Sequence, residues 1–260
     1  MKRNQLVIGL MLLVLAVGAC SRNRAVVPKV DMELLTLSKE EAFARAEALF
    51  EEKKWTRARR YYSHVYENYP NDPLGRRSLL KVADTYFHQG SPVNLIEAQY
   101  KYRDFINRYP GADSADYAML QIGMVSFKQM ERPDRDQTKT KEAVEKLSQM
   151  IAAYPNSSYR TEAQDRLQQA LDRLAKHDHI VARFYMKRGN FKAAIDRLNG
   201  IVDQYPGYVD RSETFFDLAI SLERSGRKGE ARLYYERVMA EFPESSSARK
   251  AKQKLEDFQA

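Results

Sequence analysis

Residues 231–243 read ARLYYERVMAEFP, and four variants of this stretch precede it in the chain. Each variant ends in an aromatic residue followed by proline, and each carries an alanine twelve residues before that proline. The five alanines are Ala58, Ala98, Ala143, Ala194 and Ala231. Because alanine fills roughly one position in ten, five in register by chance have odds of about one in a hundred thousand. The chain is therefore built from repeats.

Each repeat carries the pattern of a helix with one apolar stripe. Positions four and seven residues after the alanine are also apolar or aromatic, so all three lie on one face. The proline ends the helix, and a second small-residue pattern precedes three of the copies. We interpret all of these positions as core packing: Tyr62, Tyr102, Leu147, Leu198 and Tyr235; Val65, Phe105, Met150, Ile201 and Val238; and upstream Ala46, Leu49, Ala182, Tyr185, Gly189, Ala219, Leu222 and Gly226.

The spacing is that of tetratricopeptide (TPR) helix pairs, stretched beyond the usual 34 residues or so. Two of the extra segments are turns or loops, at 88–94 and 129–141. A third, 157–188, contains no glycine or proline and predicts one connecting helix about 45 Å long. Ser38 and Glu41 form a capping box that begins the first helix. The sequence predicts an all-α superhelical solenoid of five TPR-like helix pairs with a C-terminal capping helix after Pro243.

The N-terminus has the pattern of a lipoprotein signal. Two cations precede an apolar segment, residues 6–17, that is too short to span a bilayer. It leads to VGAC, where Cys20 is the only cysteine of the chain. We expect a signal peptide over 1–19, N-palmitoyl and S-diacylglycerol modification of Cys20, and a lipidated flexible tether over 20–37. Ser21 after the cysteine favours the outer membrane. An ordinary signal peptide with a chance cysteine is the alternative.

We expect repeats 1–3 over residues 38–156, and the long helix, repeats 4–5 and the cap over 157–260. The formal net charge is +8, which falls to +6 without residues 1–19. Acidic and basic residues are mixed, whereas nucleic-acid binding requires a concentrated basic face. The sequence therefore predicts no nucleic-acid partner.

The most enzyme-like segment is RLAKHDHIVARFY, residues 173–185. His177 and His179 stand two residues apart on a helix, about 200° around it, and cannot share one metal ion. Asp134 and Asp136 lie in a charged loop without an apolar pocket to shift a carboxylate pKa. No phosphate-binding or nucleophile motif is present. We therefore expect no catalytic residue, cofactor or metal.

The same segment contains a candidate partner-binding face. Ala182 and Tyr185 are expected to face the core, so the four residues given below lie on a second side of the same helix. In TPR proteins this second side lines the concave groove that binds ligands. The alternative is that it is a polar face in contact with solvent only. The candidate residues are His179, Arg183, Met186 and Lys187.

Three longer segments, residues 172–198, 135–159 and 116–124, resemble the BamD (ComL-type) lipoproteins of the outer-membrane β-barrel assembly (BAM) machinery. The resemblance covers nearly all of 38–258. It implies a non-enzymatic scaffold on the periplasmic face of the outer membrane. It further implies that the C-terminal repeats bind POTRA domains of a BamA-like barrel protein, and that an N-terminal groove accepts extended segments of unfolded barrel substrates. Other BAM lipoproteins would be further partners.

The resemblance also points to Arg197, which matches an arginine of the BamA-binding region in that family. His177 and His179 depart from the family pattern, as does the short loop of repeat 3. Two other functions fit a TPR lipoprotein: a secretin pilotin or a cell-division coordinator. A cell-wall enzyme is a third alternative, which the absence of catalytic motifs opposes.

Overall fold

The computed structural model describes residues 34–257, which form eleven helices and no strand. The helices pair as five repeats followed by one last helix. The first three pairs are α3 (Lys39–Glu51) with α4 (Trp55–Asn68), α5 (Pro73–Gln89) with α6 (Pro92–Arg108), and α7 (Ala115–Lys128) with α8 (Thr138–Ala153). The last two pairs are α9 (Arg160–Lys187) with α10 (Phe191–Gln204) and α11 (Arg211–Arg224) with α12 (Lys228–Glu241), and α13 (Ser246–Asp257) follows. The predicted all-α TPR solenoid is confirmed.

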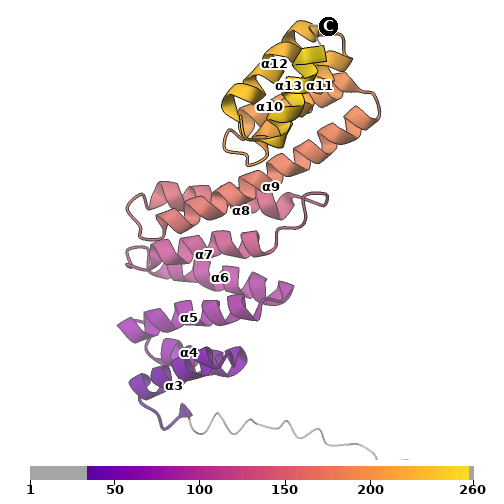
Figure 1. Ribbon diagram of the computed structural model, residues 1–260. Coiled ribbons are helices and arrows are strands. Elements are labelled where there is room, and N and C mark those ends of the chain that lie inside the picture. The colour runs from indigo at the N-terminus through magenta and orange to yellow at the C-terminus, as the bar shows by residue number, and fades with distance from the viewer. Residues whose placement is uncertain (1–33, 258–260) are drawn as a thin grey trace, which may run out of the picture.

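Helices α3 to α8 stack in chain order, and α9 runs obliquely out of that stack (Figure 1). The helices that follow gather around the far end of α9 as a second lobe. Each helix packs on the next one along the chain. The long helix predicted over 157–188 is confirmed as 28 residues, which is about 42 Å at 1.5 Å per residue.

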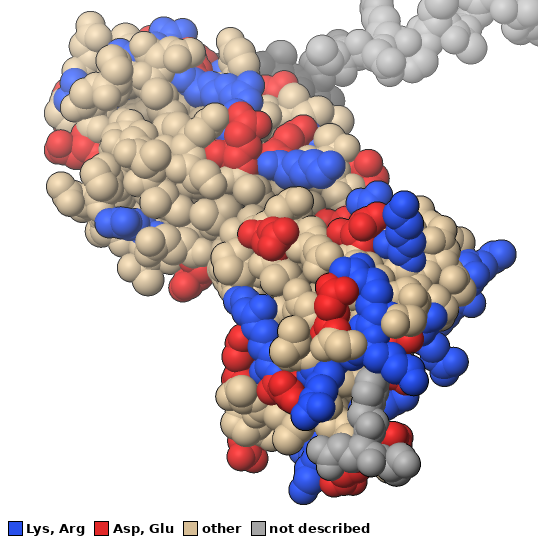
Figure 2. Space-filling model, turned by 90° about the horizontal axis from the view of Figure 1, so that it is seen from above, with Lys and Arg blue, Asp and Glu red and all other residues tan. Residues whose placement is uncertain are grey.

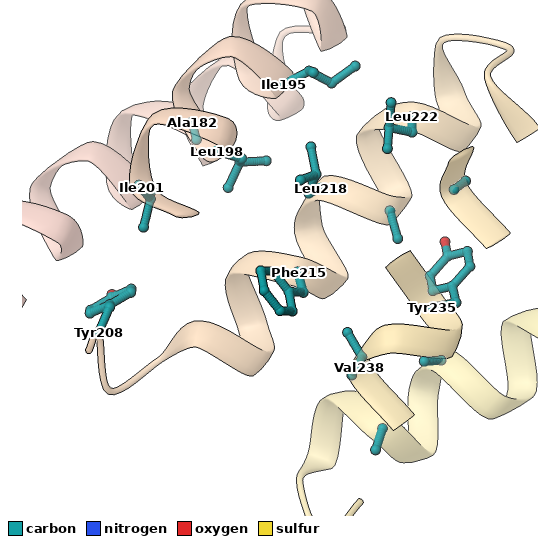
Figure 3. Packing of buried hydrophobic residues seen from close by; sticks show 14 of the residues in the cluster. Ala182, Ile195, Leu198, Ile201, Tyr208, Phe215, Leu218, Leu222, Tyr235 and Val238 are labelled. Carbon is teal, nitrogen blue, oxygen red and sulfur yellow. The ribbon is translucent and has the colours of Figure 1, made fainter. Parts of the chain in front are cut away.

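The repeat register places most of the core where the sequence predicts it, but Gly189 and Gly226 are exposed, so their assignment to core packing is wrong. All five marker alanines are fully buried, and the two apolar positions that follow each of them are buried as well. In the C-terminal lobe, Leu198 and Ile201 of α10 face Phe215 and Leu218 of α11, and Tyr235 lies beyond them on α12 (Figure 3). A small residue at the marker position lets the paired helices approach closely enough for these larger side chains to interlock.

The first helices of four repeats end in the same way. Lys53, Gly90, Gly189 and Gly226 all have positive φ, between 58° and 84°. Each stands seven residues after a buried alanine: Ala46, Ala83, Ala182 or Ala219. This left-handed residue reverses the chain into the second helix, and glycine adopts it without strain. The shared position allows residue-by-residue comparison between repeats.

Both ends of the solenoid are closed by short segments. The capping box between Ser38 and Glu41 is present at the start of α3. Leu34 is buried and Leu37 partly buried against the first repeat, so the expectation of a flexible tether reaching residue 37 is wrong at its last residues. At the other end, α13 packs Ala248 and Ala251 onto the C-terminal core. Cys20 and the expected signal peptide lie outside the described residues.

Candidate partner-binding surfaces

Three adjoining hollows lie along repeats 2 and 3, with volumes of about 500, 480 and 380 Å³. The first lies between the start of α5 and the end of α6, and the second continues along α5 to the start of α9. Asp113 lines all three, so they form one continuous groove. Its apolar walls come from Leu80, Phe105, Tyr109 and Tyr159.

A buried carboxylate fixes the centre of this groove. Asp84 of α5 accepts hydrogen bonds from the hydroxyls of Tyr102, at 2.7 Å, and Tyr117, at 2.9 Å. Burial raises the pKa of the Asp84 carboxyl more than these hydrogen bonds lower it. Burial likewise raises the pKa of the Tyr117 hydroxyl, so both tyrosines stay neutral donors. The network holds α5, α6 and α7 together and orients Tyr117 along the groove.

The groove has cations on one wall and acids on the other. Arg77 and Lys81 of α5 approach Glu47 of α3 at 3.7 and 3.6 Å, while both line the second hollow. Across from them, the Asp116 carboxylate accepts a 2.6 Å hydrogen bond from the Ser157 hydroxyl. Apolar walls between opposite charges suit an extended peptide, whose side chains alternate and whose backbone carries both donors and acceptors.

In the C-terminal lobe, the structure corrects the prediction for His179. Its side chain is only 1% exposed, and its Nε2 lies 2.9 Å from Asp217 Oδ2 on α11. A partner cannot reach it in this conformation, so its assignment to a binding face is wrong. His177 lies on another side of α9, where its Nδ1 is 2.7 Å from the carbonyl oxygen of Pro133. The two histidines contact different repeats, as their spacing predicted.

Arg183 joins His179 in this contact between repeats 4 and 5. Its Nε donates to Asp217 Oδ2 at 2.6 Å, and its Nη2 lies 2.6 Å from Glu213 Oε1. Burial alone would raise the pKa of Asp217, but hydrogen bonds from His179 and Arg183 outweigh it and lower that pKa. Arg183 thus stabilises the lobe while keeping part of its side chain in solvent.

The remaining candidates divide between core and surface. Met186 is partly buried against the C-terminal core, whereas Lys187 is exposed. Arg197 on α10 is about half exposed and lies 3.4 Å from Asp178 of α9. Of the five predicted residues, Lys187 and Arg197 are therefore the ones with freely accessible charges.

Sequence reasoning missed two exposed apolar residues on α9, Ile180 and Phe184. Phe184 is 53% exposed, with the Arg188 guanidinium 5.3 Å above its ring. The residues equivalent to Phe184 in repeats 2, 3 and 5 are Thr85, Val125 and Ser221, and none of them exceeds 1% exposure. In repeat 1, which has no repeat before it, the equivalent Ala48 is exposed.

The reason lies in the course of α9. In a regular solenoid this face of a first helix packs on the preceding repeat. The first half of α9 packs on α8, and its Arg173 donates to the Glu131 carbonyl at 2.6 Å. Towards its C-terminal end α9 runs out of the stack (Figure 1), and Ile180 and Phe184 are exposed there. We call this surface, with Arg188, the uncovered face of α9. Repeat 4 thus begins a second stack.

The surface chemistry differs between the two lobes. Figure 2 shows Lys and Arg side by side with Asp and Glu over the lobe that bears the C-terminal end, whereas broad uncharged areas cover the visible face of the other. Within residues 34–257, no cluster of three or more His, Cys, Asp or Glu side chains could hold a metal ion. No helix in that range is long and apolar enough to cross a bilayer.

Residues 36–236 match the family model described as YfiO, outer membrane lipoprotein. The chain belongs to this family. The match extends from the turn before α3 into α12 and so includes both the groove and the uncovered face of α9. Membership in this family associates the chain with the outer membrane.

Two proteins illustrate what this chain is similar to along most of its length. Outer membrane protein assembly factor BamD of Neisseria meningitidis is 28% identical over 217 residues, covering 79% of this chain and 80% of that protein. BamD of Rickettsia prowazekii is 22% identical over 250 residues and 94% of both chains. Among solved structures, the TPR2AB domain of yeast Sti1 covers 85% of this chain with 13% identity and a TM-score of 0.44.

Proposed function

We propose that this chain is a lipid-anchored scaffold of the BAM complex on the periplasmic face of the outer membrane. The relatives are assembly factors, and membership in the YfiO family carries the proposal. The scaffold binds partners and catalyses no reaction. Its buried polar side chains form hydrogen bonds between repeats, such as those of Asp84 with two tyrosines and of Asp217 with His179 and Arg183. Acylated Cys20 would hold it on the membrane, and other BAM lipoproteins would attach to the same scaffold.

The groove over repeats 2 and 3 is the proposed site for extended segments of unfolded β-barrel substrates. Its aromatic walls suit the alternate aromatic side chains of a barrel strand, and its cations on α5 suit a carboxylate. Arg76 and Arg77 both line the first hollow, and replacing them with alanine should weaken binding of a synthetic barrel-strand peptide about tenfold. Arg232→Ala, on the opposite lobe, is the control. Equal affinities of the two variants in a fluorescence-anisotropy titration would exclude this groove.

The uncovered face of α9 is the proposed site for the POTRA region of a BamA-like protein, and Arg197 of α10, beside Asp178 of α9, is a second proposed contact. Phe184 offers an aromatic anchor beside cations, the composition that dominates the energy of protein interfaces. No preceding repeat covers this face. A partner can therefore pack on it in the way that a preceding repeat packs on the other first helices.

The test is affinity purification from detergent-solubilised membranes after cross-linking. The wild-type chain should recover a POTRA-bearing barrel protein, and Phe184→Ser or Arg197→Ala should reduce that recovery without lowering the melting temperature. Val209→Ser removes a comparably exposed apolar side chain elsewhere on the lobe and serves as the control. Recovery of no POTRA-bearing protein in any sample would refute the proposed function.

The lipid anchor has a separate test. Cys20→Ala should leave the chain uncleaved or in the periplasmic fraction, because the acyl chains supply membrane affinity. Outer-membrane recovery of this variant at the wild-type level would contradict the anchor.

A further inference from the structure

Helix α6 carries an unusual row of exposed apolar side chains. Val93, Ile96 and Tyr100 are 69%, 65% and 62% exposed. Their spacing of three and four residues aligns them on one side of the helix. The side chains that α6 buries, Leu95, Ala98, Tyr102 and Phe105, point elsewhere, into the core between α5 and α7. We call the exposed row the α6 stripe.

The repeat architecture does not require this stripe. Counting from the marker alanines, the equivalents of Ile96 are Thr56, Lys141, Lys192 and Gly229, and those of Tyr100 are Arg60, Glu145, Asp196 and Leu233. Repeat 2 is therefore the one repeat that is apolar at both positions. Val93 lies on an extra turn that α6, with 17 residues, shares with the 16-residue α8 but not with α4, α10 and α12, which have 14, and its equivalent in α8 is the polar Thr138. Since packing does not explain the stripe, it marks a contact with something outside the chain.

Basic side chains flank the stripe. Lys101 lies beside it with its Nζ 5.6 Å from the Tyr100 ring. Arg103 is exposed one turn further on and forms no ion pair with another described residue. Arg57 and Arg60, exposed on α4 at the same orientation in the preceding repeat, are likewise outside every ion pair of residues 34–257. Glu97, partly buried, is the acid closest in sequence to Ile96, and Asp104, four residues after Tyr100, is neutralised by an ion pair with Arg108 at 2.7 Å. The surroundings of the stripe therefore suit phosphate groups.

We propose that the α6 stripe rests on the phospholipid surface of the membrane to which the chain is anchored. Val93, Ile96 and Tyr100 enter the boundary between headgroups and acyl chains, and the neighbouring cations contact lipid phosphates. This is how an interfacial amphipathic surface binds: apolar residues at the boundary, an aromatic ring at headgroup level, and basic residues around them. The inference rests on the proposed outer-membrane location.

The length of the N-terminal segment allows this placement. About 14 residues separate Cys20 from the first described residue, Leu34, and they span at most roughly 46–50 Å when extended. Leu34 packs on the first repeat, and α6 is three packed helices away from α3. At 8–10 Å between axes, that path is about 30 Å at most. An acylated Cys20 and the α6 stripe can therefore contact the same membrane.

The form of the surface favours lipid over a protein partner. The stripe consists of three side chains projecting from α6, and none of them lines a described hollow. The nearest hollow, of about 290 Å³, begins at Arg103, beyond the last residue of the stripe. A stable protein interface needs roughly 800 Å² from each partner and a pocket for its anchors, whereas lipid accepts isolated projecting side chains.

The test uses the full lipidated chain with Val93→Cys, labelled with an environment-sensitive fluorophore. Acylation blocks Cys20, so the introduced thiol is the only reactive one. The protein is reconstituted into vesicles of phosphatidylethanolamine and phosphatidylglycerol, with or without lipids that carry a doxyl quencher. The control is Leu233→Cys, because Leu233 is 64% exposed at the position equivalent to Tyr100 in repeat 5.

We expect quenching at position 93 to be at least threefold stronger than at position 233. Ile96→Ser with Tyr100→Ser should abolish the difference and leave the melting temperature unchanged, because both side chains are exposed. Equal quenching at the two positions overturns the inference, as does a label at 93 that is shielded only when another envelope protein is added. A Cys20→Ala version with excess vesicles separates the anchor from the stripe. If this unlipidated protein binds the vesicles and its label at position 93 is quenched, but at a higher lipid concentration than the lipidated protein needs, the stripe binds lipid by itself. If the unlipidated protein binds the vesicles without quenching of the label, the inference fails.

Discussion

Replacing Asp217 with asparagine should destabilise the C-terminal lobe selectively. Asp217 Oδ2 accepts charge-assisted hydrogen bonds from His179, at 2.9 Å, and from Arg183, at 2.6 Å. Losing one partner of a buried charge pair costs about 3–5 kcal/mol. Arg183 keeps Glu213 at 2.6 Å and is partly in solvent, which lowers the cost. We therefore expect a loss of about 2–3 kcal/mol in the free energy of unfolding.

Two optical probes can localise this loss. Trp55, in repeat 1, is the only tryptophan of the chain, so its fluorescence reports the N-terminal repeats. Far-UV circular dichroism reports all helices. Since each repeat of a solenoid is stabilised mainly by its neighbours, the variant should lose ellipticity at a urea concentration about 1–2 M lower than wild type, with the Trp55 transition unchanged.

Asp84→Asn is the matched control, because Asp84 is also a buried carboxylate between repeats. Its hydrogen-bond donors are neutral tyrosine hydroxyls, and burial raises the pKa of its carboxyl. A neutral amide of the same shape should therefore cost less than about 0.5 kcal/mol at pH 7. If both variants shift both probes equally, or if Asp217→Asn shifts neither, the role assigned to the carboxylate at Asp217 is wrong.

Three further predictions concern pH and local packing. Because the pKa of Asp217 is lowered in the fold, its carboxylate stabilises the lobe above the ordinary value of 3.8 and ceases to do so as pH falls through the lowered pKa. The urea midpoint of the ellipticity transition should therefore fall below about pH 4 in wild type but hardly change in Asp217→Asn. In Gly75→Ala the new Cβ would lie 1.7 Å from the Tyr69 carbonyl oxygen, so the Trp55 transition should lose about 2–3 kcal/mol, whereas Gly111→Ala, with nothing within 4 Å, should lose little. Ser38→Ala removes the capping box of α3 and should cost about 1 kcal/mol, measured by the same fluorescence titration; an unchanged midpoint would contradict the cap.

The repeats could be read from sequence because their main packing rule is local. A helix pair needs a small residue where the two helices are closest, larger apolar residues one and two turns later, and a breaker after them. Ala194, Leu198 and Ile201 satisfy this rule within eight residues of one helix, and all three are buried. The length of α9 followed in the same way from the absence of glycine and proline.

The candidate site could not be read in this way because each first helix has a second buried side. That side packs on a neighbouring repeat, and between α9 and α11 it uses polar groups. His179 and Asp217 therefore have the sequence signature of a solvated face, although both are buried. Sequence periodicity cannot separate a hydrated polar residue from one paired with a partner 38 positions away.

The sequence by itself determined the helix pairs, their number and their core, since these depend on contacts within about forty residues. The tertiary structure decided which faces remain free. Ile180 and Phe184 are apolar like core residues, yet they are exposed because α9 extends beyond the stack that would cover them. The course of one helix relative to its neighbours depends on all the interfaces together, and no single segment of the chain encodes it.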